Sequence, residues 1–275
     1  MSDKVWRKIF LGSTSVFMIL FCMTPVVFMV AVSFSLEPDF LSGQTEFLFT
    51  LNNFKNILML RNLHFISYLK NSIFISGISA VITVLIAALG AYSITRFKFK
   101  WKIPVLLFIL GISMFPQISI VGYLFKIISE IGLINTYPAL IFPYISWTLP
   151  LSLWILVSYF SQIPDEIDNA GLIDGANRMQ ILVKLIFPIA APGLFSTLLL
   201  AFIAGFNEFL FALMLTTDFR CQTIPVGITM FQGLHGEIPW GNIMAASVIS
   251  VIPIVLLILA FQKHIVQGLT KGAIK

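Results

Sequence analysis

Six long stretches of the sequence are almost free of charged residues. They cover residues 9–36, 72–95, 103–125, 137–160, 185–216 and 243–262. Each is long enough to span a bilayer, because a membrane helix needs about 20 mostly apolar residues to cross roughly 30 Å of hydrocarbon. The sequence therefore predicts an all-α, polytopic membrane protein with six transmembrane helices.

Composition supports this class and argues against others. Of 275 residues, 58% are hydrophobic and 11% are charged, whereas about a quarter of the residues in soluble domains are charged. The net charge of +5 does not indicate a nucleic-acid partner, because 27 phenylalanines and so few charges do not make a basic groove. Cys22 and Cys221 lie far apart and indicate neither a disulfide framework nor a metal site.

Basic residues are distributed unequally between the predicted loops. If the N-terminus is cytoplasmic, twelve of the 17 Lys and Arg residues lie on the inner side and five on the outer side. Cytoplasmic loops carry such an excess, so both termini are predicted to lie in the cytoplasm. The densest basic run, residues 96–102, alternates with aromatic side chains in an inner loop and suits an anchor at the membrane interface.

Two predicted loops are too long to be simple turns. In the outer loop, residues 37–71, apolar residues recur at helical spacing and predict an amphipathic helix along the membrane surface: Leu51, Phe54, Ile57 and Leu58. The inner loop, residues 161–184, is acidic where a basic loop is expected. Acids after Pro164, a turn at Gly175 and an apolar run predict two short helices. Two hypotheses remain for this loop, docking to a partner protein or a purely structural role.

The inner loop also resembles the EAA loop of ABC importer permeases. In that family Glu-Ala-Ala is followed after three residues by Gly, and after nine more by Ile-x-Leu-Pro. Here Asn169-Ala170-Gly171 is followed at the same spacings by Gly175 and by residues 185–188. Asn169 replaces the usual glutamate and Gly171 replaces the second alanine, while Asp168 offers an acidic charge one position earlier.

Other segments are similar to the sugar-importing branch of this family, namely residues 132–136, 173–176, 206–212 and 261–273. The likeness covers nearly the whole chain and is strongest from about residue 69 onward, with the second permease subunit of maltose- and trehalose-type transporters nearest. It implies the ABC type-1 importer permease fold. Residues 1–68 would form the N-terminal helix and an extracytoplasmic loop, residues 69–262 the transmembrane domain, and residues 263–275 a cytoplasmic tail.

The resemblance implies a permease subunit in the inner (cytoplasmic) membrane that carries a sugar, or a related polyol or sugar phosphate, into the cell. The implied partners are a second related permease, two ATPase subunits that hold ATP and Mg²⁺, and an extracytoplasmic sugar-binding protein. This chain would bind no cofactor and catalyse no reaction, since it has no catalytic pair and no phosphate-binding loop. The residues implied to couple it to the ATPases, by polar contacts and close packing, are Asp168, Asn169, Ala170, Gly171, Asp174, Gly175, Ala176, Arg178 and Pro188.

The C-terminal tail resembles one that reaches between the ATPases in maltose-type relatives. Gly268 and Gly272 predict flexibility, and Lys271 offers charge. The alternative is a basic end held by anionic lipid.

Glu208 is the only charged residue inside the six predicted spans. Because an ionisable group that faces lipid is costly, Glu208 is expected to face the bundle interior or water. Either Asn207 and Glu208 line the pathway or its outer gate, or they belong to a structural hydrogen-bond network. Tyr144 and Trp147 are candidate sugar contacts, with packing or an interfacial belt as the alternative. An ion-coupled secondary transporter or channel remains the alternative function, although it would need more buried charges.

Overall fold

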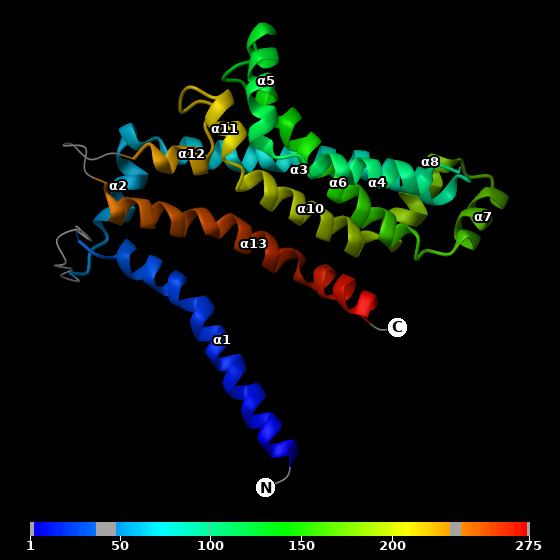
Figure 1. Cartoon of the computed structure of the whole chain (residues 1–275), viewed down its shortest axis with the longest axis horizontal. Coiled ribbons are helices and arrows are strands. Elements are labelled where there is room, and N and C mark those ends of the chain that lie inside the picture. The colour runs from blue at the N-terminus through cyan, green and yellow to red at the C-terminus, as the bar shows by residue number, and fades with distance from the viewer. Residues whose placement is uncertain (1–2, 37–47, 99, 232–237, 274–275) are drawn as a thin grey trace. The chain divides into compact units, whose positions relative to one another are not determined.

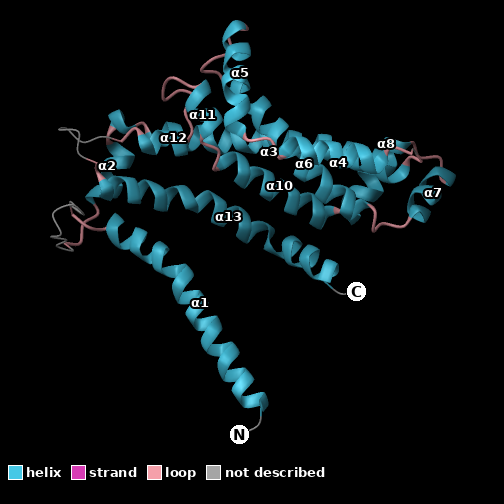
Figure 2. Cartoon of the chain, viewed as in Figure 1, coloured by secondary structure: helices cyan, strands magenta, loops and turns pink. Residues whose placement is uncertain are grey.

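The computed structural model describes residues 3–36, 48–98, 100–231 and 238–273, and helices make up most of these ranges (Figures 1 and 2). Within them no strand is assigned, and one antiparallel bridge joins Ser35 and Phe49. The predicted all-α class is therefore confirmed. Four helices are long and apolar enough to cross a membrane, at least over part of their length: α1 (Asp3–Ser33), α3 (Phe65–Arg96), α6 (Tyr137–Phe160) and α13 (Trp240–Ala273).

Two further candidate spans are bent. The helices α4 (Lys102–Ser113) and α5 (Gln117–Glu130) meet at 85°. The helical segment 178–189 meets α10 (Ala191–Phe206) at 84°. If each bent pair counts as one span, the described chain has six candidate spans, as predicted.

The bends make the predicted spans 103–125 and 185–216 interrupted rather than continuous, and proline explains both breaks. Pro116 immediately precedes α5, and Pro192 lies in the first turn of α10. In the first turn of a helix, proline removes no helical hydrogen bond, because the amides there have no partner within the helix. Within a continuous helix, proline would remove one hydrogen bond and clash with the preceding turn. The predicted span 185–216 is interrupted a second time, because α10 stops at Phe206 and a separate short helix, α11 (Leu210–Leu215), follows.

The chain divides into two compact units, residues 1–66 with 228–252 and residues 67–227 with 253–275. In the second unit α4 and α10 both pack on α6. A buried apolar cluster joins α3, α4 and α6 to the segment after α7, and its members include Ala88, Ala91, Leu106, Leu156, Phe160, Ile181 and Ile186. Near the middle of the bundle, the hydroxyls of Thr83 on α3 and Thr148 on α6 lie 3.0 Å apart and form a buried hydrogen bond.

In the first unit the predicted amphipathic helix is present as α2 (Asn52–Met59), with Ile57 buried. The Asn53 amide fixes α2 to the end of α1 by donating hydrogen bonds to the carbonyls of Ser33 and Ser35, at 3.0 and 2.8 Å. The ring of Phe54 packs on Phe34, whose centroid is 4.8 Å away.

The C-terminal segment is helical, whereas the sequence predicts a flexible tail. Residues 263–273, expected to form a flexible tail, continue α13 as a helix that contains Gly268, Lys271 and Gly272. A glycine costs a helix only about 1 kcal/mol relative to alanine, so two of them do not end it.

Candidate functional site

The predicted inner loop, residues 161–184, is called the coupling loop below. It folds as two short helices at one end of the helix bundle of the second unit, opposite the end that holds α11 (Figure 1). The first, α7 (Asp165–Ile173), follows Pro164. Three acidic residues in its first turn stabilise it by interacting with the positive end of the helix dipole. It ends in a Schellman motif, in which the amide of Gly175 donates to the Leu172 carbonyl (3.1 Å) and that of Ala176 to the Gly171 carbonyl (2.9 Å). Gly175 has φ of +81°, which glycine adopts without strain.

The second helix, α8 (Arg178–Ile181), begins with a capping box. The Asn177 side chain accepts from the Gln180 amide, and the Gln180 side chain accepts from the Asn177 amide, both at 2.9 Å. The chain then continues through a π-helical segment (Leu182–Ile186) into α9 (Phe187–Ile189), where Pro188 lies in the first turn. The predicted pair of helices and the turn at Gly175 are therefore both present.

Asp168 attaches α7 to the end of α3. Its carboxylate lies 2.9 Å from Nε of Arg96, accepts a hydrogen bond from the Tyr92 hydroxyl at 2.7 Å, and lies 3.9 Å from the Arg178 guanidinium. The side chains of Arg96 and Asp168 are only 5% and 3% exposed. Asp168 thus holds the loop inside this chain instead of offering its charge to a partner, which corrects the role expected for it.

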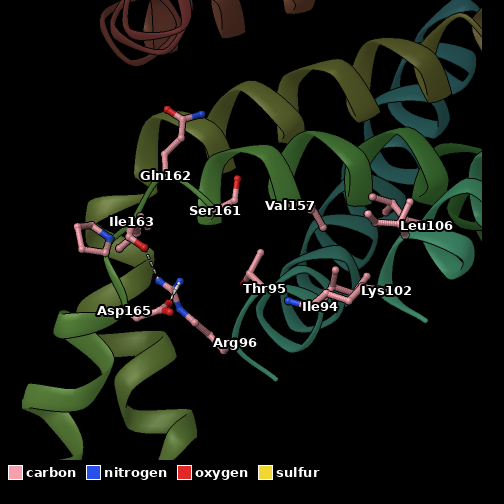
Figure 3. A pocket seen from close by; sticks show the side chains of 12 residues that line it. Ile94, Thr95, Arg96, Lys102, Leu106, Val157, Ser161, Gln162, Ile163 and Asp165 are labelled. Atoms are coloured by element: carbon pink, nitrogen blue, oxygen red, sulfur yellow. Dashed lines mark hydrogen bonds and ion pairs between the residues drawn. The ribbon is translucent and has the colours of Figure 1, made fainter. Parts of the chain in front are cut away.

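Arg96 makes two more contacts with the start of the loop. One guanidinium nitrogen donates to Asp165 at 2.7 Å and another donates to the Ile163 carbonyl at 3.0 Å (Figure 3). The sequence assigned Arg96 only to an interfacial anchor, and it gave no indication of Tyr92. Their roles become visible only when α3 and α7 are brought together, because both lie far from Asp168 in the chain.

The small residues of the loop differ in what surrounds them. A Cβ atom at Gly171 would lie 2.9 Å from a side-chain carbon of Ile181, so Gly171 allows α7 to pack on the following segment of its own chain. Gly171 is therefore not a contact surface for a partner. Gly175, in contrast, has open space around it. The outer face of α7 and its turn is formed by exposed residues, among them Glu166, Asn169, Ala170, Ile173 and Asp174. Ile173 is 86% exposed.

Glu208 lies in the break between α10 and α11. The sequence instead predicts that it lies within a continuous membrane helix. One carboxylate oxygen accepts from the Phe211 amide at 2.8 Å and the other from the Ala212 amide at 3.1 Å. The residue is 8% exposed. These bonds satisfy the free amides at the start of α11, which is the work of a helix cap. The geometry therefore favours the structural hypothesis for Glu208.

The other pathway candidates are placed in different surroundings. Tyr144 is fully buried in an apolar cluster that also contains Phe211 and Ala212. Trp147 is half-buried, and its ring meets that of Phe211 edge-on with centroids 6.4 Å apart. Asn207 is exposed, and its amide donates to the Ile203 carbonyl at 3.0 Å. Of these residues, Asn207 and Trp147 keep exposed surface in this conformation.

The opposite end of α3 is fixed by a second polar network. The Asn71 amide donates to the carbonyls of Phe219 and Gln222 at 3.1 and 2.9 Å. The side-chain oxygen of Asn135 accepts from the amide of Asp218 at 3.3 Å. A hydrogen bond from the Arg220 amide is the main reason that the pKa of Asp218 is lowered from its ordinary value. Both ends of α3 are therefore held by loops.

Within the described ranges, no group of three or more His, Cys, Asp or Glu residues is arranged to hold a metal ion. The two cysteines are free thiols, with Cys22 exposed and Cys221 buried. At the α7–α8 end, the geometry shows a helix pair that is anchored to α3 and has an exposed outer face.

Known proteins share this sequence and fold. Residues 83–271 match the family model described as "Binding-protein-dependent transport system inner membrane component". The chain is 54% identical to the trehalose/maltose transport system permease protein of Thermococcus litoralis, over 100% of this chain and 99% of the relative. It is 42% identical to the trehalose transport system permease protein of Mycobacterium tuberculosis, over 82% of each chain. A chain in the crystal structure of a bacterial ABC transporter involved in alginate import shares the fold, with a TM-score of 0.76 at 19% identity, covering 96% of this chain and 97% of that one.

The sequence match, the structural match and the candidate membrane helices agree with one another. They show a multi-pass membrane protein with the fold of an ABC importer permease. The chain belongs to the family of binding-protein-dependent transport system inner membrane components.

Proposed function

We propose that this chain is a permease subunit of an ATP-driven importer that carries a sugar across the inner membrane. A binding protein delivers the sugar outside, a second related permease completes the pathway, and two ATPase subunits bind ATP and Mg²⁺ in the cytoplasm. This chain itself hydrolyses nothing. The identity of 54% to a trehalose/maltose permease supports a disaccharide of this kind as substrate.

The observation behind the coupling role is the way the α7–α8 loop is built. Its inner face is clamped by the buried pair between Arg96 and Asp168, while its outer face presents Ile173 and neighbouring polar residues. An exposed apolar tip is suited to bind in a cleft of a partner protein. Because the helix that bears the tip is firmly packed, a movement of the partner is transmitted to α3. We therefore place the ATPase contact on Asn169, Ala170, Ile173, Asp174 and Gly175.

This assignment fixes the orientation. The loop and both termini are cytoplasmic, as the distribution of basic residues predicts. The tail residues Gly268, Lys271 and Gly272 then lie on the same side of the membrane as the ATPases. We propose that the tail contacts them. Asn207 and Trp147 remain candidates for lining the pathway.

The test uses two changes at one exposed position. In the complete transporter, reconstituted in vesicles, Ile173→Glu places a charge at the tip and Ile173→Val keeps it apolar. We expect Ile173→Glu to abolish ATP-dependent uptake of labelled trehalose and maltose and to weaken retention of the ATPase, with Ile173→Val close to wild type. Normal uptake and retention in Ile173→Glu would overturn the docking assignment. Absence of any sugar uptake in the wild type would instead contradict the proposed substrate class.

No observation favours an ion-coupled transporter. Glu208 is the one acid that the sequence places inside a span, and both of its carboxylate oxygens are occupied by backbone amides of the same chain. These two hydrogen bonds give the carboxylate a structural role at the start of α11.

A further inference from the structure

A cavity of about 460 Å³ lies where the ends of α3 and α6 meet the start of α4 and the first residues of the coupling loop (Figure 3). Its size falls in the range of about 300–1,000 Å³ that is usual for ligand sites. One part of its wall is apolar and includes Ile94, Leu106 and Val157. The other part is polar and includes Thr95, Arg96, Lys102, Ser161, Gln162 and Asp165.

The positive charge of the cavity is not fully compensated. The guanidinium of Arg96 is already engaged by Asp165, Asp168 and the Ile163 carbonyl. Lys102 extends from the first turn of α4 along the cavity wall (Figure 3). No ion pair that involves Lys102 is found in the part of the chain that the structure describes. Its ammonium is therefore available to an anionic ligand.

The helix that bears Lys102 adds to this charge. Trp101, at the start of α4, gives no side-chain cap to the amides of the first turn. The positive end of the helix dipole therefore lies at the same place as the ammonium group. An anion bound here would be favoured by both.

The surroundings of the cavity indicate which kind of anion would fit it. The apolar side chains of Trp101, Ile103 and Phe108 on and beside α4 are about 70% exposed, in a helix pair that is apolar enough to cross the membrane. A ligand that fits must present a negative head to Lys102 and an apolar part to Leu106 and the face of α4. A soluble nucleotide fits poorly, because Asp165 brings a negative charge into the same wall.

We propose that this cavity binds the headgroup of an anionic membrane phospholipid, with its phosphate at Lys102 and one acyl chain along α4. The basic run 96–102, interpreted from the sequence as a general interfacial anchor, thereby acquires one specific binding position. Because Ile163, Pro164 and Asp165 form part of the wall, a bound lipid also braces the entry to α7. This bracing rests on the proposed function, whereas lipid binding does not.

The experiment compares two lysines of the same loop. Lys102→Gln and Lys98→Gln each remove one positive charge, but Lys98 is exposed and does not line the cavity. The complete transporter is reconstituted in phosphatidylcholine vesicles, and the binding of spin-labelled phosphatidylglycerol is measured against that of spin-labelled phosphatidylcholine. We expect Lys102→Gln to lower the preference for phosphatidylglycerol about fivefold, the effect of one basic residue at a membrane surface. Lys98→Gln should leave it unchanged.

Several results would overturn the proposal. Equal losses in both variants would show diffuse attraction to the basic loop, and no loss in either would show that the cavity binds no lipid. Displacement of the labelled lipid by inorganic phosphate would assign the cavity to a soluble anion. A second variant, Val157→Phe, fills the apolar side while keeping every charge, and it should also lower the preference. Since no sugar is transported in this assay, its outcome is independent of the proposed function.

Discussion

Three side chains converge on the buried carboxylate of Asp168. Arg96 and Tyr92 come from α3, and Arg178 comes from the start of α8. Removing charges from water is costly, so such a pair adds little net stability compared with an apolar pair, but it fixes one arrangement. The consequence is a coupling loop with a defined position at the end of α3.

Loss of one partner leaves the other charge buried and unpaired. We expect Arg96→Ala to lower the free energy of unfolding by about 3–5 kcal/mol. Arg96→Lys, which keeps the charge but loses the planar set of donors, should fall between Arg96→Ala and the wild type. The measurement is unfolding of the purified permease, with exposed Lys98→Ala as the control. Equal stability of Arg96→Ala and Lys98→Ala would contradict the clamp.

Glu208 allows a second test at the same scale. Because both oxygens cap α11, we expect Glu208→Gln to cost about 1 kcal/mol of stability through the loss of one acceptor, while the apparent affinity for sugar stays unchanged. Glu208→Ala should cost more, since it removes the cap entirely. Unfolding and uptake kinetics measured on the same preparations separate the two effects. A large change in sugar affinity with normal stability would restore the pathway hypothesis.

The helices show how far sequence reasoning reaches. The α7–α8 pair was predictable because Pro164, the early acids and Gly175 are local signals that act within a few residues. The bends at residues 114–116 and at Ala190 are less predictable from the sequence, because Pro116 and Pro192 are compatible both with a kinked span and with a break. Neighbouring helices decide between these outcomes, and single-sequence patterns contain no information about them.

The candidate site also has features that the sequence predicts and features that it does not. Its position in the chain follows from motif spacing, but the division of its residues into an inner and an outer face does not. Asp168 and Gly171 are turned inward by the packing of α7, whereas Asn169 and Ala170 are exposed. That division depends on Arg96 and Ile181, which reach α7 only through tertiary packing.

Close packing of α10 on α6 depends on one small residue. A Cβ atom at Gly193 would lie 2.5 Å from the Tyr159 ring, so a methyl group there must displace the ring or the helix. We expect Gly193→Ala to destabilise the permease by about 1–3 kcal/mol, the usual effect of overpacking. Gly77→Ala on α3, where no atom lies within 4 Å, is the matched control and should be nearly neutral. Unfolding measurements that show equal effects would contradict this packing.

At the scale of the whole molecule, α3 defines opposite ends of the second unit. Its Asn71 end is bonded to residues 219 and 222, and its Arg96 end is bonded to the coupling loop. The 25 residue steps from Asn71 to Arg96 separate these ends by about 38 Å at 1.5 Å per step, more than the thickness of the hydrocarbon layer. We therefore expect Lys98 and Arg220 to lie on opposite sides of the membrane.

This topology predicts sided labelling. In a background that lacks Cys22 and Cys221, a membrane-impermeant thiol reagent applied to intact cells should label Arg220→Cys and leave Lys98→Cys unlabelled. Inside-out vesicles should give the reverse. Labelling of both positions from one side would contradict the orientation, and with it the cytoplasmic placement of the coupling loop.

In our proposal, the outer face of α7 contacts the ATPase. This contact is tested by cross-linking in the assembled transporter, with a reagent that attaches to the thiol of Ile173→Cys in the same cysteine-free background and forms its second bond on illumination. The result expected is a cross-link from position 173 to the ATPase, with none from Arg220→Cys at the other end of the second unit. Absence of any cross-link from position 173, in a complex that still contains the ATPase, would contradict the claim.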